Sequence, residues 1–153
     1  MKNKGKSKLK EFTVYAAFIV IPILLGTYIY IALAPDTYPH ILFERLFPGI
    51  DLTIQRTEEN YHLTGFLRNY LCDFLWAFSL ESCIMLIFNG CKRQLLISVI
   101  ISSLFSVIIE VLQKFELIFG VFDIIDLACE IIAVILAGLI INFLLGGKSN
   151  ENK

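Results

Sequence analysis

Charge is scarce in this sequence, and its scarcity excludes several classes of protein. Charged residues make up 18% of the 153 residues, whereas hydrophobic residues make up 57%. Soluble domains carry about a quarter charged residues, so the apolar excess must be buried in something other than a water-exposed fold. The formal net charge of −1 provides no overall basic field for nucleic acid. The composition therefore predicts an integral membrane protein, with the lipid bilayer as its partner and no nucleic-acid partner.

Motifs for catalysis and metal binding are also missing. The four cysteines have no metal-ligand spacing, and there are no zinc motifs, glycine-rich phosphate loops or nucleophile elbows. We interpret the cysteines as packing residues, and a Cys72–Cys129 disulfide is not favoured. His40 and His62, the only histidines, are expected on surface loops. The sequence predicts no cofactor and no metal site, and it favours a protein that is not an enzyme.

Four apolar runs have the length of a membrane-spanning helix, which is about 20 residues. The predicted spans are 12–33, 70–88, 95–112 and 126–145. The predicted fold class is thus all-α, an integral membrane bundle of four transmembrane helices without a separate soluble domain. Residues 1–11 are expected to be a disordered basic tail, 34–69 the one long loop, and 146–153 a polar tail.

The distribution of lysine and arginine predicts the orientation of this bundle. Five lysines precede the first span, two basic residues lie between the second and third, and two follow the fourth, against four on the opposite side. By the positive-inside rule, both termini are cytoplasmic and the long loop faces outward. Within that loop, the apolar residues between Ile41 and Phe47 suggest a short amphipathic segment in the outer membrane interface.

Acidic and amide side chains are concentrated at the outer ends of the predicted spans. The candidate ligand-binding residues are Asp73, Glu110, Gln113, Asp123, Asp126 and Glu130, with Glu81, near mid-membrane, as a secondary candidate. Steps of three and four residues place those of the last span on one helix face, which Ala133 and Ala137 continue. Carboxylates in this position have to be protonated, reached by water, or neutralised by a cation or a positive group of a ligand.

Simpler interpretations apply to some polar residues. Asp123 stands where the N-cap of the last span is expected. Ser98, Ser102 and Ser106 recur every four residues, and we interpret them first as a packing surface between helices. The first span has no ionisable side chain after Glu11, so no chemistry is assigned to it.

Three stretches resemble the VanZ-like family, which is named after a teicoplanin-resistance membrane protein. They are Glu110-x-x-Gln113 with Asp126 and Gly138 after a short glycine-containing loop, NYLCDFLWAFSL, and GVFDIIDLACEIIA. The resemblance covers roughly residues 61–142. The sequence departs from the family at Glu130, where an asparagine is common, and in having only Lys114 as a basic residue before Asp126. The resemblance implies a multi-pass protein of the bacterial plasma membrane, of a family linked in some members to glycopeptide tolerance.

Three functional hypotheses follow. The first is a VanZ-like envelope protein that binds or shields a polar ligand, either a lipid headgroup or a cell-wall precursor, in an outward-facing acidic pocket. The second is a small proton- or cation-coupled transporter, suggested by the depth of Glu81 and Glu130. The third is a structural subunit of a membrane complex, a homo-oligomer included, suggested by the serine and alanine stripes.

Overall fold

The computed structural model describes residues 2–35, 37–54, 57, 61–89, 91, 93–118 and 120–146, with side chains between Lys8 and Leu145. Its helices are α1 (Lys2–Leu33), α2 (Tyr38–Leu46), α3 (Tyr61–Phe66), the π-helical turn η1 (Leu67–Leu71), α4 (Cys72–Ile87), α5 (Gln94–Lys114) and α6 (Ile124–Gly146). α3, η1 and α4 follow one another without a break, and no strand occurs in the described residues. Within this part of the chain, four helices are long and apolar enough to cross a membrane. The all-α class with four potential spans is confirmed.

Two helices begin earlier than the sequence analysis expected. α1 starts at Lys2, so the proposed disordered tail is instead helical. Lysine and glutamate are good helix formers, and no proline interrupts the chain before Pro22. The second span starts at Tyr61 rather than at residue 70, because its first residues contain no proline and one glycine does not break a helix. The long loop is correspondingly shorter and contains α2, the predicted amphipathic segment.

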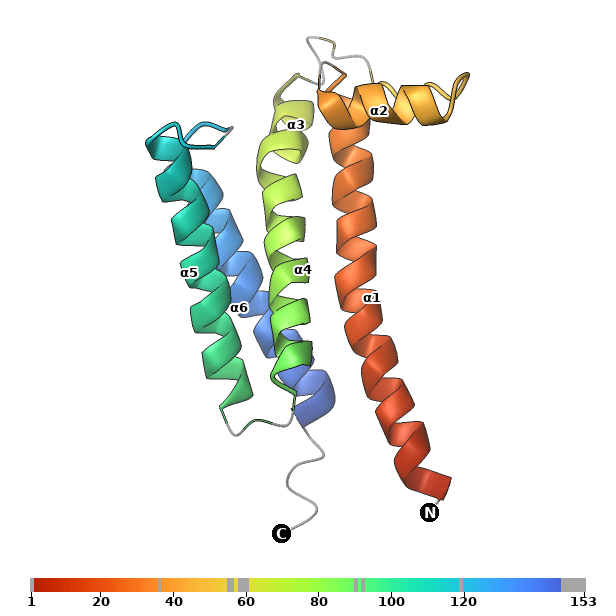
Figure 1. Cartoon of the computed structure of the whole chain (residues 1–153), viewed down its shortest axis with the longest axis vertical. Coiled ribbons are helices and arrows are strands. Elements are labelled where there is room, and N and C mark those ends of the chain that lie inside the picture. The colour runs from red at the N-terminus through yellow and green to blue at the C-terminus, as the bar shows by residue number, and fades with distance from the viewer. Residues whose placement is uncertain are drawn as a thin grey trace.

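Other predictions lie partly outside the described residues. Four of the basic residues used to predict the orientation lie outside the described part, namely Arg56, Lys92, Lys148 and Lys153. The predicted polar tail beyond Gly146 lies outside it as well. Figure 1 shows that α1 begins and α6 ends at the same end of the bundle. That arrangement is consistent with both termini on one side of a membrane, and their cytoplasmic location stays a prediction.

α4 is the central helix of the bundle. It packs against α1, α5 and α6, whereas α1 has few contacts with α6. Figure 1 shows α5 on one side of α4 and α1 on the other, with α6 running obliquely from beside α5 to the lower end of α4, and α2 lying across the end of α1. We call the end of the bundle that carries α2 and the α5–α6 connection the distal end. The termini mark the opposite end.

Small or precisely fitting residues fill the interior. Ala77 of α4 packs with Ala133 and Val134 of α6, and small side chains of this kind let helices approach closely. A second cluster, Tyr15, Met85 and Ile141, lies nearer the termini. The outer surfaces of the four long helices carry exposed leucine, isoleucine and phenylalanine. Such a surface suits lipid rather than water, since hydrocarbon imposes no cost on exposed apolar groups.

Candidate functional site

A cavity of about 650 Å³ lies among the helices of the bundle. All six primary candidates from the sequence line it, namely Asp73, Glu110, Gln113, Asp123, Asp126 and Glu130. Its wall is completed by Tyr30, Ala34, Thr37, Arg68, Asn69, Ile109, Gly120, Val121 and Phe122. Residues next to α2 and residues of the α5–α6 connection both line the cavity, which places it at the distal end. We call it the distal cavity.

α6 and the residue just before it contribute three acids to the distal cavity. Asp123 precedes the helix and caps it, because its Oδ1 accepts the backbone N–H of Ile125 at 2.8 Å. The predicted N-cap is therefore confirmed. Asp126 and Glu130 follow at steps of three and four residues and also line the cavity. The same face continues into Ala133 and Ala137, which are fully buried.

α5 contributes Glu110 and Gln113, and both are tied to the α5–α6 connection. The Glu110 side chain is 3% exposed, and its Oε2 accepts the backbone N–H of Asp123 at 3.2 Å. The side chain of Gln113 packs against Gly120, whose backbone has φ +137°. A Cβ at that position would collide with Gln113, so glycine is required for both reasons. These two contacts hold the connection over the cavity.

The third wall comes from η1 and the start of α4, and part of it was missed by the sequence analysis. Asp73 was expected there, and its carboxyl is within electrostatic reach of those of Asp126 and Glu130. Arg68 and Asn69 line the same cavity. In a regular α-helix, residues 68 and 73 would point about 140° apart. The i→i+5 bonding of a π-turn brings residues five apart close to alignment.

Arg68 changes the charge balance expected for the site. The sequence analysis counted it as an outer loop charge, because the second span was thought to start two residues later. The Arg68 Nε donates to Asn69 Oδ1 at 2.9 Å, and Arg68 forms no ion pair with any acid in the described part of the chain. Lys114 lies over the ring of Phe122, 5.2 Å from its centroid, and is absent from the cavity wall.

α1 also reaches the distal cavity, although no chemistry was assigned to the first span. Tyr30, close to the end of α1, and Ala34, just beyond it, line the wall together with Thr37. Tyr30 supplies a phenolic hydroxyl, which can donate or accept a hydrogen bond. Tyrosine is enriched near the ends of membrane-spanning helices, so Tyr30 in the sequence gives no specific signal of a site.

Three acceptor oxygens in the distal cavity have no hydrogen-bond partner among the residues that the structure describes. They are Gln113 Oε1, Asp126 Oδ1 and Glu130 Oε2, and each of these atoms is shielded from solvent. Buried polar atoms nearly always have a partner in native structures. Oxygens of this kind accept hydrogen bonds, so what the site lacks is a donor or a positive charge.

Glu81, the secondary candidate, is separate from this cavity. Its side chain is fully buried, and it does not line the distal cavity. Ser98 Oγ donates to its Oε1 and Ser102 Oγ to its Oε2, both at 2.6 Å. The serine stripe is therefore more than a packing surface, because two of its hydroxyls serve one acid on α4. Ser106, a turn farther along, is buried, and its side chain hydrogen-bonds the carboxyl of Glu130.

The histidines and cysteines complete the account of the predicted residues. His62 is exposed at the start of α3. His40 is only 4% exposed, so the expectation that it lies on the surface was wrong. Cys72 and Cys129 are both free thiols. No group of three or more metal-binding side chains suited to an ion occurs among the described residues.

Comparison of the chain with family models, curated proteins and solved structures finds no match.

Proposed function

We propose that the protein is a VanZ-like membrane protein of the bacterial cell envelope that binds or shields a polar ligand in the distal cavity. The ligand carries a protonated primary amine next to an anionic group, as in an amino-phospholipid headgroup or an amine-bearing cell-wall precursor. The observation that carries this proposal is the set of three buried acceptor oxygens, one on α5 and two on α6, that have no partner among the described residues.

A primary ammonium fits these three oxygens by charge and by number of donors. It has three N–H donors and no acceptor, whereas the unpartnered groups are all acceptors. Five carboxyl groups surround the same space. Hydrogen bonds between an ammonium and carboxylates are charge-assisted, and they gain strength where water is excluded. A quaternary ammonium would bring the charge without the donors.

Arg68 supports an anionic group on the same ligand. Its guanidinium stands on the η1 wall and is not paired with the acids of the cavity. Opposite charges that share a cavity without contacting each other leave room for a molecule that satisfies both. A planar guanidinium binds phosphate or carboxylate through two parallel hydrogen bonds.

A lipid-binding experiment tests the recognition of the amine. The purified protein is melted in detergent while fluorescence of Trp76, the only tryptophan, is followed with added phosphatidylethanolamine or phosphatidylcholine. We expect phosphatidylethanolamine alone to raise the melting temperature, because only its ammonium has N–H donors. Asp126→Asn and Gly120→Ala should abolish the difference, the latter by displacing Gln113. Glu116→Gln, which removes a charge outside the cavity, should retain it. Equal stabilisation by both lipids would refute the proposed recognition.

A second experiment tests the role in the envelope. Cells that produce equal amounts of wild type, Glu110→Gln or Asp126→Asn are compared for teicoplanin susceptibility. We expect both variants to differ from wild type and Glu116→Gln to match it. Identical susceptibility of all four strains would exclude this role.

The other two hypotheses receive less support from the geometry. Transport was suggested partly by Glu81, whose two oxygens are occupied and which lies away from the distal cavity. A structural subunit was suggested by the small-residue stripes. Ala133, Ala137, Ser98 and Ser102 are fully buried within the bundle, so they are not available to a partner.

A further inference from the structure

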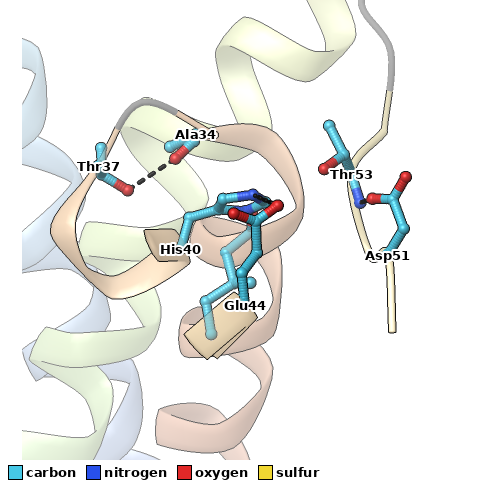
Figure 2. A network of polar contacts seen from close by, with 7 residues as sticks. Ala34, Thr37, His40, Glu44, Asp51 and Thr53 are labelled. Carbon is cyan, nitrogen blue, oxygen red and sulfur yellow. Dashed lines mark hydrogen bonds and ion pairs between the residues drawn. The ribbon is translucent and has the colours of Figure 1, made fainter. Parts of the chain in front are cut away.

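His40 lies at the corner where α2 crosses the end of α1, apart from the groups used above. Its Nδ1 is 2.7 Å from the backbone carbonyl oxygen of Ile31, and its Nε2 is 3.2 Å from Glu44 Oε1. Figure 2 shows Glu44 folded back against the imidazole ring, with Asp51 on a neighbouring segment. The ring itself is almost completely buried.

Both atoms that face the ring nitrogens are acceptors. A backbone carbonyl has no proton to donate, and neither has an ionised carboxylate. A neutral imidazole has one N–H and one acceptor nitrogen, so it can satisfy only one of these two contacts. The arrangement is complete only when both nitrogens carry protons.

The end of α1 favours the same charged form. The last four carbonyls of a helix lack intrahelical partners, and a helix C-terminus carries partial negative charge. Three of these carbonyl oxygens have partners here. The Tyr30 carbonyl accepts from the N–H of Ala34, the Ile31 carbonyl from the His40 ring, and the Ala32 carbonyl from the N–H of Ile54. His40 therefore acts as a capping residue for α1, supplied by another helix.

The charged groups around the ring can be named for each element packed against it. α2 supplies Glu44, and the segment after α2 supplies Asp51. α1 supplies the Ile31 carbonyl and no charged group. The hydrogen bond to Ile31 raises the pKa of His40 most, burial opposes it, and Glu44 and Asp51 raise it further.

We propose that His40 is a protonated latch, which holds α2 against the C-terminus of α1 and releases it when the imidazole loses a proton. The latch bears on the distal cavity, because Ala34 and Thr37 line that cavity and precede His40 by a few residues. Thr37 Oγ1 and N–H both donate to the Ala34 carbonyl, which makes this corner a compact unit. Loss of the latch at alkaline pH would loosen one wall of the cavity.

The proposal is tested first on the wild-type protein, without any ligand. ¹⁵N-histidine-labelled protein in micelles is titrated while both ring nitrogens are observed by NMR, and His62→Gln assigns the two histidines. We expect His40 to show two protonated nitrogens at neutral pH and to titrate at a higher pH in wild type than in Glu44→Gln. A neutral His40 tautomer at pH 6, or a titration unchanged by Glu44→Gln, would overturn the proposal.

Hydrogen exchange then measures the release of α2. In wild type, amides between residues 38 and 54 should exchange severalfold faster above the His40 titration than below it, after correction for the intrinsic pH dependence. His40→Gln retains one donor but cannot be protonated, so its exchange should be fast at both pH values. α6 serves as the internal control. Equal protection in wild type and His40→Gln at low pH would contradict the latch, whatever the fate of the ligand proposal.

Discussion

The environment of Glu81 allows a quantitative prediction about the centre of the bundle. Ser98 and Ser102 donate to its two oxygens, and the side chain has no exposed surface, so water cannot replace either hydroxyl. Leaving a buried acceptor unsatisfied costs about 1–3 kcal/mol. Interhelical hydrogen bonds in membrane proteins average about 0.6 kcal/mol and reach about 1.7. Because both contacts are short and sealed, we expect about 1.5 kcal/mol for each of Ser98→Ala and Ser102→Ala.

A double-mutant cycle separates this bond energy from general packing. In a Glu81→Met background the serines no longer have an acid to serve, and methionine is an unbranched side chain that adapts to irregular gaps. The two serine substitutions, which together should cost about 3 kcal/mol in wild type, should then cost less than about 1. Ser103→Ala, which alters a serine one residue from Ser102 on a different face, should change stability by less than about 0.5 kcal/mol.

Unfolding in mixed micelles with increasing sodium dodecyl sulfate, followed by Trp76 fluorescence, measures these differences. Trp76 reports on the contact between α4 and α1, because its ring packs against Gly26. If the serine substitutions cost as much in the Glu81→Met background as beside the native glutamate, then packing and not hydrogen bonding to Glu81 explains the serine stripe.

Two further predictions concern glycine and pH. Gly138→Ala should destabilise the bundle by about 1–3 kcal/mol, as overpacking does, because its Cβ would lie 2.7 Å from Leu95 Cδ1 and 3.0 Å from Glu81 Oε1. Gly65→Ala, where a Cβ meets nothing within 4 Å, should instead stabilise by up to about 1 kcal/mol, and equal effects in melting experiments would refute the packing argument. Hydrogen bonds from Thr53, first its backbone N–H and then its side chain, lower the pKa of Asp51. The Asp51 carboxylate therefore stabilises the folded state above the pKa of the unfolded chain, and this stabilisation is lost as pH falls through the folded pKa. The raised pKa of His40 has the opposite effect. Its stabilising contribution is fully present below the unfolded pKa of about 6.5 and is lost as pH rises through the folded pKa. Protection of residues 37–54 from exchange should therefore peak between about pH 4 and 6.5. Asp51→Asn should remove the acid limb and move the alkaline limb to lower pH, because the Asp51 charge also raises the pKa of His40.

Much of the architecture could be predicted because a membrane imposes long apolar runs. Their lengths determined the number of spans, and the third and fourth boundaries were placed within two residues of α5 and α6. The start of a helix was harder to predict where neither a proline nor a change in composition marks it. α1 continues into its lysine-rich segment, and the second span continues back to Tyr61, since polar helix formers propagate a helix as readily as apolar ones.

The acidic wall of the cavity could be predicted for a similar reason. Steps of three and four residues determine a helix face, and a costly carboxyl has to face the protein interior. Arg68 and His40 could not be predicted in this way. Arg68 reaches the cavity through a π-turn, which has no reliable sequence signal, and His40 is buried by a tertiary contact with a carbonyl nine residues earlier. Helical periodicity in the sequence predicts neither the π-turn at Arg68 nor the tertiary contact of His40.

The two groups of membrane acids differ in whether the protein itself satisfies them. Glu81 has a hydroxyl for each oxygen and does not line the distal cavity, so its hydrogen-bonding needs are met inside the fold. Asp126 and Glu130 lie in a cavity with acceptor atoms that no described residue serves. The bundle also supplies the Ser106 hydroxyl to Glu130, yet one oxygen of Glu130 and one of Asp126 still have no described donor. We infer that the distal oxygens are left unpaired because their donor arrives from outside the chain, and this contrast favours a binding site over a mere surplus of charge.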